Sequence, residues 1–105
     1  MISDDRAEQA LRYLVDTDEA AAQAKANMER AEYAYKRAKE MVFIHAEGTV
    51  AERSATASMH PKTKEAHEQY VSAIALYSRM ANQRDTERIV LDMWRTISAN
   101  RRAGA

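Results

Sequence analysis

The stretch that decides the fold is residues 24–45, AKANMERAEYAYKRAKEMVFIH. Its small and apolar side chains recur in alternating steps of four and three residues over three heptads. This spacing aligns them along one side of a helix and is typical of the contact line between two helices, which we call the seam. The predicted seam positions in this stretch are Ala24, Met28, Ala31, Tyr35, Ala38, Val42 and His45. Because alanines alternate with larger side chains, we expect a second helix to approach closely.

The partner helix is predicted on the other side of two breakers, and the sequence leaves open whether it comes from the same chain or from a neighbouring copy. Gly48 is expected to end the helix of residues 18–47 as a C-cap, and Pro61 suits the first position of a helix over residues 61–100. Between them, Thr49 and Glu52 fit a capping box, in which each side chain satisfies a backbone N–H, so a helical turn is expected over residues 50–58. The seam positions expected on the later helix are Tyr70, Tyr77 and Trp94. Its residues 82–88 are wholly polar, which predicts a bend or a change of partner there.

The start of the chain leaves two interpretations open. Ser3 can cap a short helix over residues 3–15, and Thr17 or Asp18 can cap the helix that follows, but the two helices could also run together. Residues 101–105 are expected to form a tail. The sequence therefore predicts an all-α fold in a single domain over residues 1–105. Its centre is an antiparallel hairpin of two long helices with short flanking helices, coiled-coil-like and oligomeric.

Composition limits the class of protein. Much of the 46% hydrophobic fraction is alanine, so the core is expected to be modest and burial on a second copy to be helpful. The 16 basic and 16 acidic side chains cancel, so no overall charge favours nucleic acid, membrane or an acidic substrate. The absence of cysteine and of a signal-peptide pattern or long apolar run predicts a protein of the cytoplasm.

No motif for catalysis or for a cofactor is present. The three histidines do not form an H-x-x-x-H pair, and no Glu-x-x-His occurs, which argues against a metal site. Two glycines cannot build a phosphate-cradling loop, and no G-x-S-x-G elbow exists. We therefore predict a protein that is not an enzyme, with no cofactor, no metal and no small-molecule substrate.

Basic clusters are the candidate binding residues. Arg84, Arg88, Arg95 and Arg102 fall near one side of the later helix, where guanidinium groups could track phosphates, and the first three are the predicted nucleic-acid contacts. The alternative is a solvated helix face with Arg88–Asp85 and Arg84–Glu87 pairs. A second cluster comprises Lys36, Arg37 and Lys39, flanked by Tyr33, Tyr35 and Phe43. It is expected either to contact phosphates or to be the exposed face around a buried Tyr35. Trp94 could stack on an unpaired base, or it could belong to the core.

The order of these features resembles the UvsY family of phage recombination mediators. The resemblance rests on Ala34-Tyr35-Lys36-Arg37-Ala38-Lys39, an aromatic and apolar stretch, the break at Gly48 and a long helix ending in Ile89-Val90-Leu91-Asp92-Met93-Trp94-Arg95 and Arg101-Arg102. It implies a helical protein that assembles into rings, binds single-stranded DNA and helps to load a recombinase onto DNA covered by single-strand-binding protein. It also implies that Lys36, Arg37 and Lys39 contact DNA and that the last helix serves assembly.

Two functional hypotheses follow from the sequence. The first is an oligomeric accessory protein of phage-type recombination or replication that binds single-stranded DNA in the host cytoplasm, with a recombinase or single-strand-binding protein as partner. The second is a helical assembly or adaptor protein with no nucleic-acid role, for which the heptad seam and the neutral net charge are sufficient.

Overall fold

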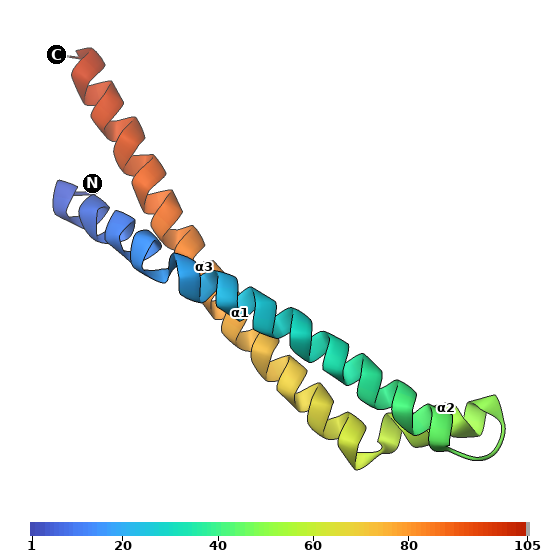
Figure 1. Ribbon diagram of the computed structural model, residues 1–105. Helices are drawn as coiled ribbons and strands as arrows, with labels where there is room; N and C mark the ends of the chain where they lie inside the picture. The colour runs from blue at the N-terminus through green and yellow to red at the C-terminus, as the bar shows by residue number, and fades with distance from the viewer. Residues whose placement is uncertain (105) are drawn as a thin grey trace. The chain divides into compact units, whose positions relative to one another are not determined.

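A computed structural model of the protein describes residues 1–104. Those residues form the helices α1 (Asp4–His45), α2 (Val50–Met59) and α3 (Pro61–Gly104), and none of them lies in a strand (Figure 1). The predicted all-α fold with two long helices packed as a hairpin is therefore confirmed. No described helix combines the length and the apolar character that crossing a membrane requires.

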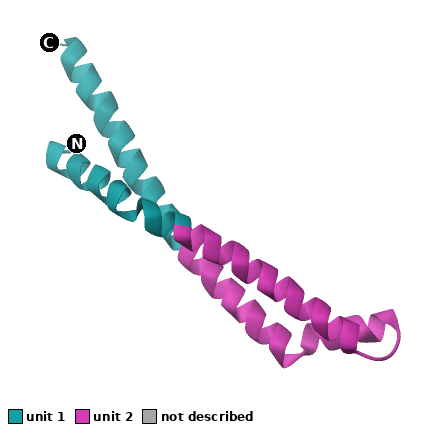
Figure 2. Ribbon diagram, in the orientation of Figure 1, with its two compact units in different colours: residues 1–22, 78–105 teal, residues 23–77 magenta. Residues whose placement is uncertain are grey.

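The described contacts gather in two compact units, each of which pairs a segment of α1 with a segment of α3 (Figure 2). Unit 2 is Gln23–Tyr77 and contains the seam of residues 24–45. There the Tyr35 ring of α1 stacks on Tyr70 of α3 with centroids 6.2 Å apart, and meets the His67 ring edge-on at 5.0 Å. The helix that begins at Pro61 is thus the seam's partner within the same chain.

Burial in unit 2 follows the heptad spacing. Ala24 is buried, and the half-buried seam residues are Met28, Ala31, Tyr35, Ala38, Val42, Tyr70 and Tyr77. His45, which was expected on the seam, is instead exposed. It is the last residue of α1, and the chain turns away after it, so no turn of α3 covers this position.

Among the described residues, unit 1 consists of residues 1–22 and 78–104. Its core is formed by Ala7, Ala10 and Leu91, against which Leu14, Val90 and Trp94 pack. Ala10 is 0% exposed, and the small side chains on α1 allow α3 to approach closely. Early residues of α1 pair with late residues of α3, as in the hydrogen bond from the Trp94 Nε1 to Asp4 Oδ1 (2.8 Å), so the pairing is antiparallel.

The break expected between residues 15 and 18 is absent, because α1 is one continuous helix. Ser3 caps it as predicted, with its Oγ accepting from the Arg6 N–H at 3.1 Å. Thr17 does not cap a second helix, since its hydroxyl donates to the Tyr13 carbonyl within α1 at 2.7 Å. The heptad spacing also continues through the expected break. The covered positions there are Ala7, Ala10, Leu14, Thr17 and Ala21.

The other helix ends also differ from the prediction. The first long helix ends at His45 rather than residue 47, and α2 reaches Met59. The expected tail at residues 101–104 is helical and belongs to α3; residue 105 lies outside the described residues. Arg101 and Arg102 occupy the last turn of α3, where positive charge interacts favourably with the helix dipole, which explains why the helix continues.

The loop between α1 and α2 depends on a glycine and a cap. Gly48 has a φ of +110°, a conformation that side chains disfavour. Thr49 caps α2 by accepting from the Glu52 N–H at 3.2 Å. The Glu52 carboxylate was expected to accept from the Thr49 backbone. It accepts instead from the Thr49 hydroxyl at 3.1 Å, so only half of the predicted capping box forms.

Gly48→Ala is expected to lower the free energy of unfolding by about 1–3 kcal/mol, because an L side chain is strained at this φ. A Cβ there would also lie 2.7 Å from Glu52 Oε2. Urea unfolding followed by circular dichroism measures the change. Gly104→Ala is the control, since its Cβ would meet nothing within 4 Å. Equal stability of the two variants would contradict the described loop.

Candidate functional site

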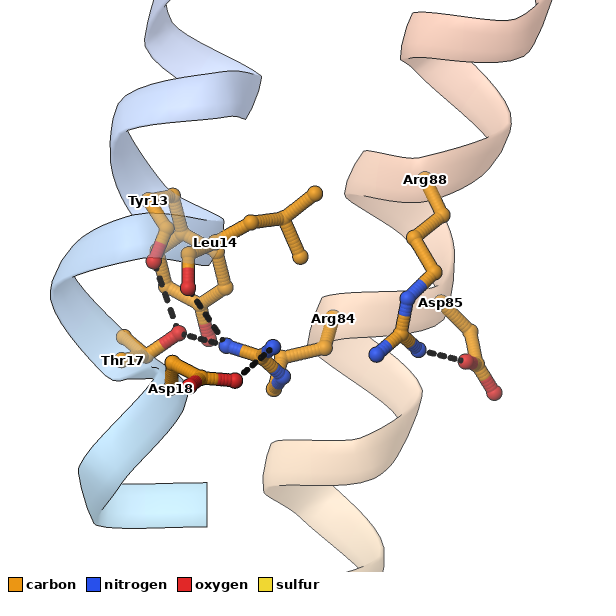
Figure 3. A network of polar contacts seen from close by, with 7 residues as sticks. All are labelled: Tyr13, Leu14, Thr17, Asp18, Arg84, Asp85 and Arg88. Carbon is orange, nitrogen blue, oxygen red and sulfur yellow. Dashed lines mark hydrogen bonds and ion pairs between the residues drawn. The ribbon is translucent and has the colours of Figure 1, made fainter. Parts of the chain in front are cut away.

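A polar layer crosses the seam of unit 1, centred on Arg84 (Figure 3). The Arg84 side chain extends from α3 to α1, where its Nη1 donates to the Leu14 carbonyl at 2.8 Å and to Thr17 Oγ1 at 2.6 Å. Its Nη2 reaches Asp18 Oδ1 at 3.3 Å. Arg84 is 7% exposed, and Thr17 belongs to the seam of α1. The guanidinium therefore makes three hydrogen bonds to the opposite helix.

A second ion pair crosses the same unit. Arg6 Nη1 and Nη2 donate to the two carboxylate oxygens of Glu87 at 2.6 and 2.9 Å, a two-bond geometry that favours both charged forms. The hydrogen bonds from Arg6 lower the pKa of Glu87, and the hydrogen bond to Glu87 raises the pKa of Arg6. The predicted Arg84–Glu87 pair does not form, since each of these residues contacts α1 instead. The predicted Asp85–Arg88 pair does form, at 2.7 Å.

Arg84 must therefore be removed from the predicted set of phosphate contacts. It lies seven residues before the buried Leu91 and seven after the half-buried Tyr77, so it occupies a seam position of α3. That spacing was readable in the sequence, but the polar character of residues 82–88 led to the expectation of a bend or an exposed face. The seam instead continues through these residues as a layer of hydrogen bonds.

Arg88 and Arg95 remain exposed on α3. Each is paired within its own helix, Arg88 with Asp85 at 2.7 Å and Arg95 with Asp92 at 3.3 Å. Exposed pairs of this kind contribute little to stability and exchange partners readily. Both arginines therefore keep access to an anionic ligand.

The cluster of Lys36, Arg37 and Lys39 is exposed on α1 in unit 2. Lys36 pairs with Glu32 at 2.9 Å, and this hydrogen bond raises the pKa of Lys36. Arg37 and Lys39 form no ion pair with any residue of 1–104. Tyr35 beside them packs on α3, whereas Tyr33 is 67% exposed. The cluster thus surrounds a seam residue and keeps two cations without a partner.

A hollow of about 520 Å³ near the ends of the chain brings an aromatic ring and several cations together. We call it the terminal cleft; its lining residues are Asp4, Trp94, Arg95, Ser98, Arg101 and Arg102. Trp94 is half-buried, packs on the core of unit 1 and still lines the cleft. The two interpretations of Trp94 are therefore compatible, since the ring has one side in the core and another at the cleft.

Arg101 was not considered as a binding residue, and Arg102 was placed on the phosphate-facing side of the helix but left out of the predicted site; both had been assigned to a tail. A helix that continues past residue 100 carries them to the side of Trp94, and their spacing of seven and eight residues from Trp94 was the available signal. Asp4 was equally unexpected, since it reaches the cleft only through the antiparallel pairing of α1 with α3.

Comparison of the chain with protein-family models, curated proteins and solved structures gives no significant match. The resemblance to the UvsY family therefore stays a prediction. Among residues 1–104, no three His, Asp or Glu side chains are placed to hold a metal ion. The terminal cleft and the Lys36–Lys39 cluster are thus the candidate sites that geometry and charge define.

Proposed function

We propose that this chain is a non-enzymatic accessory protein of phage-type recombination or replication that binds single-stranded DNA as an oligomer in the host cytoplasm. A recombinase or a single-strand-binding protein is the proposed partner, in the manner of the UvsY-like mediators that the sequence resembles. The observation that carries the proposal is the terminal cleft, where Trp94 lies among Arg95, Arg101 and Arg102.

The cleft has the two components that single strands require. An aromatic face stacks on any base, and neighbouring guanidinium groups contact the phosphates on either side. A volume of about 520 Å³ falls within the range of small-molecule sites and is large enough for a base. The Asp4 carboxylate in the same cleft repels a phosphate, and the chain has no net charge that would attract one. Binding is therefore expected to be strongest at low salt, where the cleft arginines are screened least.

Self-association is proposed from the exposed surface. The chain exposes 7817 Å², about 1,900 Å² more than the roughly 5,900 Å² expected for a compact monomer of 11.9 kDa. Specific interfaces bury roughly 1,200–2,000 Å² in total. Four of the five buried apolar residues are alanines, whereas Ile89 and Met93 on α3 are 59% and 51% exposed. A second copy would cover apolar surface that the hairpin leaves in water.

A helical assembly or adaptor protein without a nucleic-acid role is the second candidate. It is favoured by the ion pairs that already engage Lys36, Arg88 and Arg95 and reduce the field around them. Both candidates assemble, so only a nucleic-acid measurement separates them.

The test uses Trp94, which is the only tryptophan of the chain. Oligothymidine added at low salt is expected to quench its fluorescence by stacking. In the double variant Arg101→Gln with Arg102→Gln, affinity is expected to fall roughly tenfold. The slope of log affinity against log salt should fall by about 1.4, the value for two lost single-strand phosphate contacts. Asp4→Asn is expected to bind more tightly, because it removes the opposing charge and keeps an acceptor for the Trp94 N–H.

Arg88→Gln is the matched control, since Arg88 is exposed on the same helix and does not line the cleft. The double variant Arg37→Gln with Lys39→Gln measures the contribution of the second cluster. Absence of quenching at low salt would remove the single-stranded DNA proposal and leave the adaptor. An equal loss of affinity in Arg88→Gln and in the cleft variant would remove the terminal cleft as the place where DNA binds.

A further inference from the structure

A second hollow, in unit 2, differs in chemistry from the terminal cleft. It lies where α1, α2 and α3 meet and has a volume of about 520 Å³. Met41, Val42 and Ala46 contribute apolar lining, and His45, His60 and Lys62 contribute its ionisable groups. We call it the tip groove. No carboxylate belongs to its lining among the described residues.

The walls of the groove are fixed by contacts outside it. Arg53 of α2 donates from Nε and Nη2 to the Phe43 carbonyl near the end of α1 at 3.2 and 3.0 Å, and this carbonyl also accepts from the Ala46 N–H at 3.3 Å. The same guanidinium lies 4.4 Å from the centroid of the Phe43 ring. These contacts hold α2 against α1, so the groove is formed before any ligand arrives and binding requires little ordering.

The start of α3 is held as well. His60 Nδ1 accepts from the Lys62 N–H at 3.1 Å, and the His60 carbonyl accepts from the Lys64 N–H at 3.0 Å. Because Nδ1 is an acceptor, the proton of a neutral His60 lies on Nε2, which is then a donor. Lys62 is the second residue of α3, directly after Pro61, and lines the groove. One side of the groove therefore presents donors and positive charge.

Apolar surface continues outside the groove. Met41, which lines the groove, is 48% exposed. Ile44, one turn further along α1 and outside the lining, is 62% exposed. Methionine adapts its shape to varied apolar partners and is common at surfaces that bind peptides. Large side chains left in water beside an apolar hollow with a polar rim are characteristic of an interaction site.

We propose that the tip groove docks a segment of a partner protein in which large apolar side chains are flanked by carboxylates. The apolar side chains would enter between Met41, Val42 and Ala46, and the carboxylates would meet Lys62 and His60. The charge of the lining decides in favour of this occupant, because a basic segment would find no counter-charge there. The inference does not depend on DNA binding, since it uses neither basic cluster of the preceding proposal.

The probe is a short fluorescein-labelled peptide of leucine and glutamate in helical spacing, matched by a peptide with lysine in place of each glutamate. Fluorescence anisotropy with the full chain is expected to show binding of the glutamate peptide and none of the lysine peptide. In Lys62→Glu, affinity for the glutamate peptide is expected to fall by at least roughly tenfold. Met41→Ala, which leaves every charge in place, is expected to weaken it less.

Lys64→Glu is the control, since Lys64 lies in the same first turn of α3 but does not line the groove. Equal binding of the two peptides, or equal losses in Lys62→Glu and Lys64→Glu, would overturn the proposal and leave only a general charge effect. Light scattering on Lys62→Glu completes the test. The mass of this variant in solution is expected to equal that of the parent protein. A fall in mass with unchanged peptide binding would show that a second copy occupies the groove and would overturn it as well.

Discussion

Arg84→Ala is expected to lower the free energy of unfolding by about 2–4 kcal/mol, the cost of removing a large side chain from a packed contact. Arg84 is 7% exposed and joins α3 to the Leu14 carbonyl and Thr17 of α1. Truncation would remove these two hydrogen bonds and the one to Asp18, and would leave a void in the seam. Urea unfolding at one protein concentration, followed by circular dichroism, measures the difference.

Arg84→Met separates packing from charge. A buried charged contact can often be replaced by an apolar side chain of similar volume without loss, so this variant is expected within about 1 kcal/mol of the parent. Arg88→Ala is the exposed control on the same helix and is expected to change stability by about 0.5 kcal/mol or less. A cost for Arg84→Ala no larger than that for Arg88→Ala would show that Arg84 does not span the seam.

Leu91→Ala is the second variant with a large expected effect, about 2–5 kcal/mol of destabilisation. Leu91 is 7% exposed. Among residues 1–104 it is the only large apolar residue that is buried. Ala7 and Ala10 pack around it. Their methyl groups have no other rotamer, so they could fill the space only if the backbone of α1 moved. Total stability of a small domain is itself about 5–15 kcal/mol, so this loss would be visible as a large shift of the urea midpoint.

Ile89→Ala is the matched control for Leu91→Ala, because it removes the same number of carbon atoms two residues away on the same helix. Ile89 is 59% exposed, so a loss of about 1 kcal/mol or less is expected at a concentration where the protein is monomeric. If Ile89→Ala cost as much as Leu91→Ala under these conditions, the assignment of the core of unit 1 to the Leu91 side of α3 would be wrong.

The candidate sites show where reasoning from sequence succeeded and where it did not. Lys36, Arg37 and Lys39 were recognised as an exposed basic cluster, because charges next to a seam residue on a helix point outwards. Arg84 was misplaced among the exposed arginines, and Arg101 and Arg102 were left out of the predicted site. Both errors concern α3, which continues as one helix through the polar residues 82–88 and past residue 100.

The spacing of residues 24–45, together with Gly48 and Pro61, was sufficient to establish two long helices, their antiparallel pairing and the side of α1 that α3 covers. These properties depend on a period of seven and on two breakers, which are local features of the chain. Whether a particular charged side chain is buried depends on what faces it across the seam. Arg84 donates to the Leu14 carbonyl, Thr17 and Asp18, and Arg6 donates to Glu87. In each of these contacts the two residues are at least 66 positions apart in the sequence. The same packing brings Asp4 to Trp94 and so creates the terminal cleft, which no stretch of sequence contains.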